Sequence, residues 1–520
     1  MGREVELKLQ VPPSAIDEVA RLPWLSEAAN APAKHENLNL VTVYFDTAKS
    51  KLRKHGLALR VRHIGADRVQ TIKALQKAAR GAFGRDEWEE KITGDKPDLK
   101  FAKGTALEPL ATKKLRRKLQ PMFETVVESA AFPIHVGDAD LELAVDRGHI
   151  KARERHEPVS EIEIELKHGD RGAIATIAER LAQSARVAYA ALSKPERGYA
   201  LSAGQSAKAV CRGAIALDPE ISTAAAFQAI ALSCLDHTAA NERAVREGDT
   251  EGVHQMRVGL RRPRAAISIF KELLPGSETE AVQSELRWLT EQLGPARDLD
   301  VLLEHRVSKE RRVPPIGRDI DLLERDLQGR RDAGLQKAKA AIDSDRYRAL
   351  GLRTALWVTN GEWSKSTEPL RVARRERPAL EFAADIFDTR SKKISKRLEE
   401  IEGLDARQRH KLRVAVKKLR YACEFFAGLF DNRKQTRERS RLTAILKTLQ
   451  GSLGALNDIE VHKRLAVMIA HPRKHTRKQA EKALAMGFIA GQEQQQIASR
   501  IAVTEKAGGK LPKSAKFWRV

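Results

Sequence analysis

Two short segments with the same alternation of acidic and apolar residues constrain the fold of this chain most strongly. Their charged residues are Glu4, Glu6 and Lys8 in the first, and Glu161, Glu163, Glu165 and Lys167 in the second. Side chains alternate between the two faces of a strand, so each segment predicts a strand with one charged and one apolar face. Stacked carboxylates repel one another, and a divalent cation, which prefers oxygen ligands, relieves that repulsion. The alternative is an ordinary strand whose charged face lies in water.

Residues 1–200 contain further short strand patterns separated by turn residues. We expect strands at 3–10, 39–46, 57–63, 69–75, 85–92, 140–146, 149–155 and 160–167, with helices near 13–21, 108–129 and 170–188. Many short, mostly antiparallel strands with few helices predict a β-barrel. Arg60 and Arg62 share one strand face, and the opposite apolar face needs burial. The pattern therefore allows an inverted barrel with a charged tunnel and helices outside, beside a barrel with its charges outside.

Length and composition set the broad class of protein. A chain of 520 residues with 42% hydrophobic content exceeds one ordinary domain and supports folded cores. Every apolar run is shorter than the ~20 residues that cross a bilayer, and the N-terminus lacks the pattern of a signal peptide. Cys211, Cys234 and Cys423 lack metal-ligand spacing and are typical of reduced thiols. We expect a cytoplasmic protein with no membrane partner, and the oligomeric state stays open.

The net charge of +24 at pH 7 is uneven along the chain. Residues 1–200 contain 34 Lys and Arg against 29 Asp and Glu, and the remainder contains 60 against 41. A polycationic second half attracts polyanions of several kinds, including polyphosphate and nucleic acid. Because the aromatic content is only 5%, stacking on single-stranded nucleic acid is not favoured, and we expect non-specific nucleic-acid binding at most.

The second half of the chain contains an internal repeat. After a linker at 201–218, strand signals end and long helical patterns occupy 219–505, followed by a basic tail at 506–520 that we expect to be loose. Residues 254–264 (HQMRVGLRRPR) match residues 410–420 (HKLRVAVKKLR), and residues 293–301 match residues 453–461. The two copies, at about 219–310 and 380–470, predict a duplicated helical bundle.

Each copy of the repeat carries a basic stripe. Its members are His254, Arg257, Arg261 and Arg264 in the first copy, and His410, Arg413, Lys417 and Arg420 in the second. Helical geometry places each set within about 80° of arc, beside an apolar stripe, and the guanidinium fork suits phosphate oxygens. The alternative is a solvated helix face. We expect Asp298 and Asp458 to cap the following helices or to hold the basic side chains.

These patterns together resemble a known combination of domains. Residues 1–200 resemble a CYTH domain of the triphosphate tunnel metalloenzyme family through EVELK (4–8), YFDT (44–47), GLALRVR (56–62), TIK (71–73), RDEWE (85–89), VDRG (145–148), EIEIELK (161–167) and SKPERGY (193–199). Residues 219–505 resemble a CHAD domain, a helical module linked to polyphosphate binding. The implied fold is an α+β antiparallel β-barrel that forms a triphosphate tunnel, followed by an all-α duplicated helical bundle.

The resemblance also implies roles for individual residues. It makes Glu4, Glu6, Glu163 and Glu165 ligands of Mg²⁺ or Mn²⁺, and Lys8, Glu87, Glu89 and Asp146 catalytic residues, with Glu161 supporting the site. Phosphate oxygens would be held by Arg60, Arg62, Lys73, Arg85, Arg147, Lys194 and Arg197. The two basic stripes would bind polyphosphate, which implies association with polyphosphate granules.

The implied activity is metal-dependent hydrolysis of inorganic triphosphate to pyrophosphate and phosphate. Hydrolysis of an organic triphosphate, such as thiamine triphosphate or an RNA 5′ end, and cyclisation of ATP use the same tunnel chemistry and stay open. A different class of function also stays open, in which the chain binds polyphosphate granules with little catalysis.

Overall fold

The computed structural model describes residues 2–28, 37–74, 84–204, 208–211, 213, 215–307, 317–471, 476–512 and 516–519. The chain forms two compact units. The first consists of Met1–Cys211, Leu232–Gly252 and Ile342–Lys365, and the second of Arg212–Ala231, Val253–Ala341 and Ser366–Val520. Two segments of the expected helical region therefore belong to the same unit as the strands.

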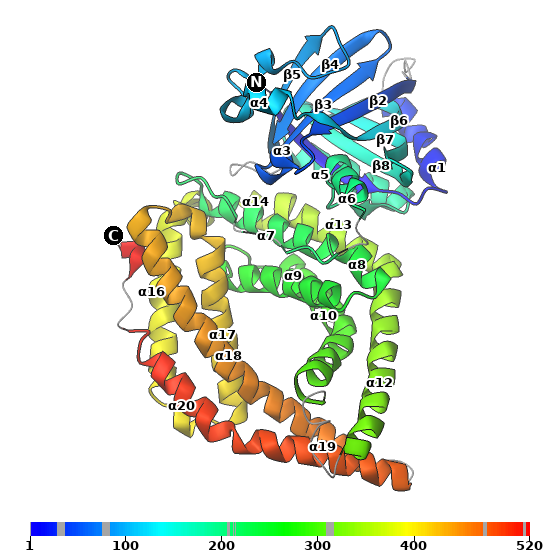
Figure 1. Cartoon of the computed structure of the whole chain (residues 1–520). Helices are drawn as coiled ribbons and strands as arrows, with labels where there is room; N and C mark the ends of the chain where they lie inside the picture. Colours follow the sequence, from blue (N-terminus) through cyan, green and yellow to red (C-terminus); the bar gives the residue numbers. More distant parts are fainter. Residues whose placement is uncertain are drawn as a thin grey trace. The chain divides into compact units, whose positions relative to one another are not determined.

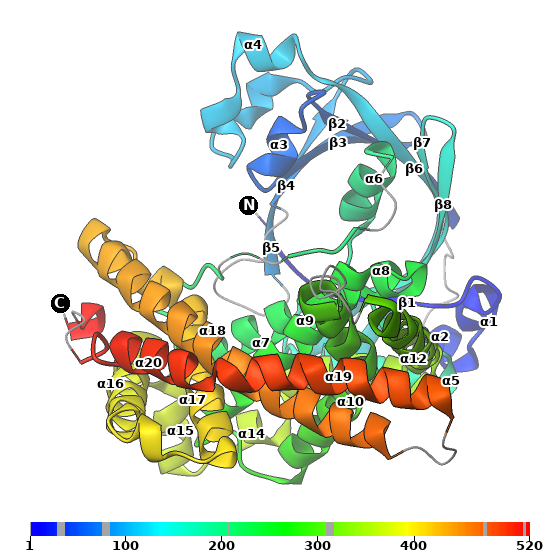
Figure 2. The same cartoon turned by 60° about the horizontal axis from the view of Figure 1, so that its bottom comes forward.

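The first unit is built on one antiparallel sheet of nine strands (Figure 1). The strands are β1 (Gly2–Gln10), β2 (Asn37–Asp46), β3 (Leu57–Ile64), β4 (Asp67–Ala74), β5 (Gly84–Ile92), β6 (Gln120–Val136), β7 (Ala139–Ala152), β8 (Arg155–His168) and β9 (Ala188–Tyr189). Their order is β5-β4-β3-β2-β6-β7-β8-β1-β9, and an additional pairing of β1 with β5 closes the sheet into a ring. Figure 2 looks into this ring, with helix α6 (Lys194–Ser202) inside it.

The two alternating segments that open the sequence argument are neighbouring strands. Lys8 of β1 lies opposite Glu163 of β8, and Glu6 lies opposite Glu165. Since directly opposite residues in a sheet share a face, the acidic and basic side chains of both strands point the same way. The apolar partners Leu7, Leu9, Ile162 and Ile164 are buried on the other face.

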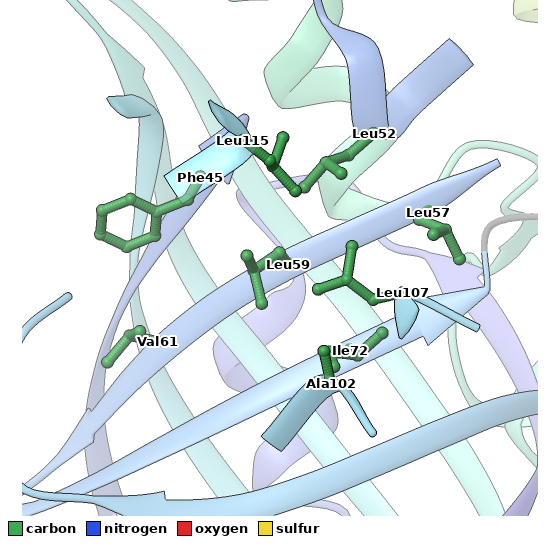
Figure 3. Packing of buried hydrophobic residues seen from close by; sticks show 9 residues of the cluster. All are labelled: Phe45, Leu52, Leu57, Leu59, Val61, Ile72, Ala102, Leu107 and Leu115. Carbon is green, nitrogen blue, oxygen red and sulfur yellow. The ribbon is translucent and has the colours of Figure 1, made fainter. Parts of the chain in front are cut away.

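The outer face of the sheet at β2, β3 and β4 is covered by short helices. These are α3 (Lys51–Lys54), η1 (Leu99–Ala102), η2 (Glu108–Leu110) and α4 (Lys113–Arg116). Leu59, Val61 and Ile72 pack outward against Leu107 and Leu115 (Figure 3). Because Leu59 and Val61 face outward, the alternating Arg60 and Arg62 face the interior of the ring. The inverted barrel is therefore confirmed.

Helix α6 fills one end of the ring. Tyr199 of this helix joins Phe123, Tyr44 and Ile150 in an apolar cluster, and the rings of Tyr44 and Phe123 stack with centroids 4.6 Å apart. A Cβ added at Gly198 would overlap the ring of Phe123, so only glycine fits there without a shift. The remaining helices of residues 1–211 are α1 (Ile16–Ala20), α2 (Pro23–Ala28) and α5 (Gly172–Ser184).

The expected helix at 108–129 is wrong for its second half. Residues 120–136 form β6, the longest of the described strands, and the helical part of the expected range is limited to η2 at Glu108–Leu110 and α4 at Lys113–Arg116. The basic run KKLRRK at 113–118 favours a helix, but Thr125, Val126 and Val127 are β-branched and Pro133 excludes a helix interior. The two strands expected at 140–146 and 149–155 form mainly one strand, β7.

Helices make up the rest of the described chain (Figure 1). They are α7 (Thr223–Ala239), α8 (Glu242–Glu247), α9 (Thr250–Ile269), α10 (Ser277–Leu302), the π-helix η3 (Leu303–Val307), α12 (Gly317–Asp343), α13 (Asp345–Asn360), α14 (Glu362–Lys365), α15 (Pro369–Glu376), α16 (Ala379–Leu398), η4 (Ile401–Gly403), α17 (Ala406–Phe425), η5 (Ala427–Leu429), α18 (Arg433–Ala470), α19 (Arg477–Gln495), α20 (Ile497–Gly508) and η6 (Phe517–Arg519). Figure 2 shows the same helices after rotation.

The two copies of the repeat occupy equivalent helices. The matching segments 254–264 and 410–420 lie in α9 and α17, and the segments 293–301 and 453–461 lie in α10 and α18. Phe270 and Phe426, which occupy the same position in the two copies, contact each other with ring centroids 5.9 Å apart. The copies therefore meet at equivalent residues.

The last described residues are not a loose tail. Phe517 and Trp518 are buried, and their rings pack on Phe387. Trp518 Nε1 donates to Asp388 Oδ1 at 3.0 Å, and Arg519 pairs with the other oxygen of that carboxylate. Two aromatic side chains that bury their surface in this way outweigh the basic composition of the segment.

Candidate active site in the closed sheet and candidate anion site in the helices

The ring encloses a charged cavity of about 580 Å³. Eight residues expected in the active site line it: Lys8, Arg60, Arg62, Lys73, Asp146, Glu163, Glu165 and Lys194. A further cavity of about 850 Å³ shares Arg60, Arg62 and Glu165 with it and is also lined by Glu87 and Glu89. Alternation along the strands thus brings side chains from five strands and α6 to one interior.

Three carboxylates form a cluster on one wall. Oxygen atoms of Asp146, Glu161 and Glu163 all lie within 4.8 Å of one another. The ammonium group of Lys194, at the start of α6, lies 2.6 Å from Asp146 Oδ2 and 2.7 Å from Glu163 Oε1, and it also pairs with Glu161. Burial disfavours the charged form of Lys194, but these three carboxylates outweigh burial and raise its pKa well above the ordinary value.

The pKa values of Glu161 and Glu163, two neighbouring carboxyl groups of the cluster, shift in opposite directions. Burial of Glu161, which is fully enclosed, raises the pKa of its carboxyl group. Burial also acts against the ionised form of Glu163, but Lys194 and Lys8 outweigh it and hold the pKa of Glu163 well below its ordinary value. The lowered pKa of Glu163 favours its ionised form, and the raised pKa of Glu161 disfavours the ionised form of that carboxylate.

Strand β1 adds a second basic group to this wall. Lys8 Nζ lies 2.8 Å from Glu6 Oε2 and 2.5 Å from Glu163 Oε1. Burial lowers the pKa of Lys8, but Glu163 and Glu6 raise it by more, so the net shift is upward. Lys8 therefore stays positive at all physiological pH values.

The opposite wall is basic. Arg60 lies 3.0 Å from Glu87, and Lys73 lies 3.1 Å from the other oxygen of the same carboxylate. Arg62 donates to the hydroxyl of Thr42 at 3.3 Å, and the neighbouring Arg60 lowers the pKa of Arg62. Two guanidinium groups that repel each other in a partly dry cavity are stabilised by an anion between them.

The carboxylate cluster fits a hard divalent cation. Asp146 Oδ1 is buried and has no hydrogen-bond partner within the described part of the chain. Asp146, Glu161 and Glu163 supply the oxygen donors that Mg²⁺ and Mn²⁺ prefer. Because Lys194 supplies the positive charge at this place, a metal ion here requires its ammonium group to move away.

Several residues implied by the resemblance lie elsewhere. Arg147 is half exposed and pairs with Asp17 and Glu128 on the outer face, because it follows the inward-facing Asp146 on β7. Arg197 is buried behind the cavity, where it pairs with Glu157 at 2.8 Å and with Glu161 at 3.4 Å. The side chains of Glu4 and Arg85 lie outside the described residues, and only the pairing of their backbones is placed.

Asp46, in the segment YFDT, has a role that the sequence did not reveal. Its buried carboxylate accepts hydrogen bonds from the backbone N–H groups of Thr47, Leu52 and Arg53 and from the hydroxyl of Tyr199. The residue therefore joins β2, α3 and α6. A short polar side chain ahead of a basic helix was the available signal.

In the helical unit, the two predicted basic stripes approach each other. Arg261 of α9 lies close enough to Arg413 and Lys417 of α17 to lower the pKa of both, after the larger effect of burial. The pKa of Lys417 falls to about 7. The Nε atoms of Arg257, Arg261 and Arg413 are buried and lack a hydrogen-bond partner among the described residues. We call Arg257, Arg261, Arg413, Lys417 and Arg420 the basic cluster.

The outer members of the stripes have other surroundings. Arg264 lies near Arg287 of α10 and Lys418 of α17. His410 is exposed and contacts Asn457 at 2.7 Å, and His254 is half-buried in α9.

Asp298 and Asp458 lie inside α10 and α18, so neither caps a helix. Asp298 pairs with Arg257 at 3.2 Å, and Asp458 acts electrostatically on Arg413 and Lys417. Of the two roles expected for these aspartates, the structure bears out the holding of a basic side chain for Asp298, through its ion pair with Arg257. Arg257 also donates to the backbone oxygens of Leu293 and Gly294.

Comparisons with known proteins support both halves of the chain. Residues 2–199 match the CYTH domain, and residues 229–467 match the CHAD domain. An inorganic triphosphatase of Haemophilus influenzae is 30% identical over 209 residues, which are 39% of this chain and 56% of that protein. An uncharacterized protein of Mycobacterium tuberculosis is 33% identical over 156 residues, which are 28% of this chain and 30% of that protein. The chain thus spans little more than half of one relative and under a third of the other.

Two solved structures are also similar. The CHAD domain from the plant Ricinus communis is 31% identical with a TM-score of 0.47, and the match covers 59% of this chain and 96% of that one. A proposed adenylyl cyclase from Hippeastrum, described as having a dominant triphosphatase activity, is 21% identical with a TM-score of 0.27 over 39% of this chain and 96% of that one. Among the described residues, no helix is long and apolar enough to span a membrane.

Proposed function

Because the chain joins a CYTH domain to a CHAD domain, we propose that its closed sheet hydrolyses inorganic triphosphate to pyrophosphate and phosphate with Mg²⁺ or Mn²⁺. The observation that carries this proposal is the division of one cavity into a basic wall at Arg60, Arg62 and Lys73 and a carboxylate wall at Asp146 and Glu163. The buried Glu161 completes the cluster of carboxylates at this second wall. A short phosphate chain needs the first wall, and its metal ion needs the second.

The residues of the cavity would share the work as follows. Arg60, Arg62 and Lys73 bind the oxygens of the phosphate chain and offset its charge, and Lys8 and Lys194 turn from their carboxylates toward phosphate. Water attacks the terminal phosphorus, the bond to the bridging oxygen breaks, and pyrophosphate leaves. Phosphoryl transfer depends chiefly on such positioning and charge stabilisation.

Asp146, Glu161 and Glu163 would hold the metal ion, with Glu6 and Glu165 beside them on the same face. Mg²⁺ or Mn²⁺ held by these residues would supply positive charge to the phosphate oxygens and would lower the pKa of a bound water. Glu87, which pairs with Arg60 and Lys73, would align the basic wall. Glu89, which accepts a hydrogen bond from Thr71 at 3.0 Å, would support the same wall.

The test is phosphate release from triphosphate by the purified full chain. The wild type should release phosphate only with Mg²⁺ or Mn²⁺, and Glu163→Gln should reduce the rate by about a hundredfold or more, because the ionised carboxylate is lost. Glu124→Gln, on the outer face of β6, is the matched control. Faster turnover of thiamine triphosphate or an RNA 5′-triphosphate, or formation of cyclic AMP, would replace the proposed substrate. No release with any of them would overturn the enzyme proposal.

We further propose that the basic cluster of the helical unit binds inorganic polyphosphate. The buried Nε atoms of Arg257, Arg261 and Arg413 support this, because cations that approach one another are stabilised by an anion with several oxygens. Binding of long-chain polyphosphate should weaken in the double variant Arg261→Ala/Arg413→Ala and not in Arg464→Ala, an exposed residue of α18. Equal affinity for RNA of matched charge at fixed salt would reduce the site to general polyanion binding.

A further inference from the structure

A chain of ion pairs leads away from the carboxylate cluster. Lys194 and Arg197 lie one turn apart on α6, so both reach the same side. Lys194 pairs with one oxygen of Glu161, and Arg197 donates to the other at 3.4 Å. Arg197 also donates through Nε to Glu157 Oε1 at 2.8 Å and through Nη2 to the backbone oxygen of Pro158. Glu157 and Arg197 thus fix the far side of Glu161.

The last link of this chain comes from α8. Arg243 donates through Nη1 to Glu157 Oε2 at 3.1 Å, while Arg197 occupies the other oxygen. Both oxygens of Glu157 are therefore engaged by guanidinium groups. Arg243 belongs to the segment 232–252, which lies within the CHAD match but in the same compact unit as the sheet. Arg243 is 57% exposed, whereas Arg197 and Glu161 are buried.

Residues 232–252 are also linked, through β9, to β1, the strand beside β8 in the sheet. Tyr189 of β9 donates its hydroxyl to Asp236 of α7 at 2.6 Å, and both side chains are buried. Strand β9 pairs with β1, and the N–H of Ala190 donates to the backbone oxygen of Lys8. Residues 232–252 therefore contact β8 directly, at Glu157, and contact β9, the strand that pairs with β1. Strands β8 and β1 carry Glu163 and Lys8.

We propose that Arg243 is a positioning residue for the tunnel: by holding Glu157 it keeps Arg197 aligned on Glu161, and so lets the CHAD segment set the affinity of the carboxylate cluster for its divalent cation. The inference rests on the proposed function, since the cluster is the proposed metal site. Without Arg243, Oε2 of Glu157 loses its partner and Glu157 can rotate. Arg197 can then adopt a second orientation, and the carboxylate of Glu161 is held less firmly in position.

Arg246 provides a matched control on the same helix. It pairs with Glu242 and with Asp343 at 2.8 Å, and it does not contact Glu157. Arg243→Ala and Arg246→Ala each remove one exposed arginine from α8, and exposed ion pairs of this kind change stability little. Arg243→Lys keeps the charge with a single point of contact instead of the fork, so it should rescue the effect in part.

The experiment measures the Mg²⁺ dissociation constant of the full chain by calorimetry without triphosphate, together with kcat, KM and Tm. Arg243→Ala should raise the dissociation constant about threefold or more, in the range that single residues along a contact network contribute. Arg246→Ala should leave it unchanged, and the Tm values of the two variants should agree within a few degrees. At saturating Mg²⁺, the KM for triphosphate should change by a smaller factor than the Mg²⁺ dissociation constant.

Equal Mg²⁺ affinity in Arg243→Ala and Arg246→Ala would overturn the positioning role. So would a loss of affinity that follows the loss of Tm in both variants. If the wild type hydrolyses triphosphate and Arg243→Ala binds Mg²⁺ as tightly as the wild type, this inference alone is refuted. If Arg243→Ala binds Mg²⁺ more weakly but the wild type does not hydrolyse triphosphate, the proposed function is refuted and the positioning role stands.

Discussion

Lys194 places its ammonium group 2.7 Å from Glu163, inside the group of carboxylates that would receive a metal ion. The two cations compete for the same oxygens, because each neutralises the repulsion among Asp146, Glu161 and Glu163. A triphosphate that draws Lys194 to its own oxygens would release these carboxylates. Substrate and metal should therefore bind more tightly together than apart, as linked ligands do.

We expect Lys194→Met to tighten Mn²⁺ binding in the absence of triphosphate, because the internal competitor is gone. The gain should be about tenfold, which corresponds to about 1.4 kcal/mol. The KM for triphosphate should rise in the same variant, since one phosphate contact is lost. Calorimetric titration with Mn²⁺ and steady-state kinetics measure the two effects. Weaker Mn²⁺ binding in Lys194→Met would contradict the competition.

Polyphosphate binding to the basic cluster should depend on pH around neutrality. Burial, with Arg413 and Arg261, lowers the pKa of Lys417 from its ordinary value to about 7, so this group loses its charge between pH 6 and 8. A polyanion favours the charged form, and its affinity should fall as the pH rises through this window, by up to about tenfold per unit. Titrations at pH 6, 7 and 8 at one ionic strength measure the change.

Lys417→Arg is the control for this dependence, because an arginine stays charged throughout the window. Its affinity should be nearly flat between pH 6 and 8. Stability has the opposite sign: the folded chain disfavours a charged Lys417, so the free energy of unfolding should rise as the pH increases from about 7 toward the ordinary pKa of lysine. A wild-type affinity that does not change with pH would show that Lys417 is not in contact with the polyanion.

Gly198→Ala should disturb the tunnel through α6. The added methyl group would overlap the ring of Phe123, and relieving that overlap moves the helix that carries Lys194. We expect a loss of about 1–3 kcal/mol in the free energy of unfolding, as for other overpacked cores, and a fall in kcat. Gly94→Ala is the control, because nothing lies within 4 Å of its added Cβ. Chemical denaturation of both variants measures the loss. Equal denaturation midpoints for the two variants would disprove the tight contact.

Trp518→Ala should destabilise the helical unit. Trp518 stacks on Phe387 with centroids 5.1 Å apart and is buried beside Phe517. Removing a buried aromatic side chain of this size costs about 3–5 kcal/mol. Thermal unfolding followed by circular dichroism gives the change, and Arg519→Ala separates the aromatic contact from the ion pair with Asp388. An unchanged Tm in Trp518→Ala would show that the segment is the loose tail that its composition suggests.

Local periodicity predicted the part of the site that depends on strand faces. Lys8, Arg60 and Glu163 point into the ring because each alternates with a buried apolar neighbour, and that information lies within a few residues. The same rule, applied to Asp146 and Arg147, places them on opposite faces. The motif VDRG obscured this, because it suggested that both residues act together.

The remainder depends on contacts between distant residues. Arg197 is drawn to Glu157 and Glu161, about 40 residues earlier in the chain, and Arg243 reaches Glu157 from 86 residues away. No local pattern encodes such pairs. Strand β6 was hidden by the basic run before it, which favours a helix, while its own pairing with β2 and β7 decides the outcome.

Strand β1 pairs with β5, β8 and β9, so its partners are synthesised about 80 to 180 residues after it. The barrel cannot close during the first part of translation. Its ring must assemble late, at the cost in folding rate that a high contact order brings. Until then Lys8 of β1 stays apart from Glu163 of β8, and the sheet does not enclose the charged cavity.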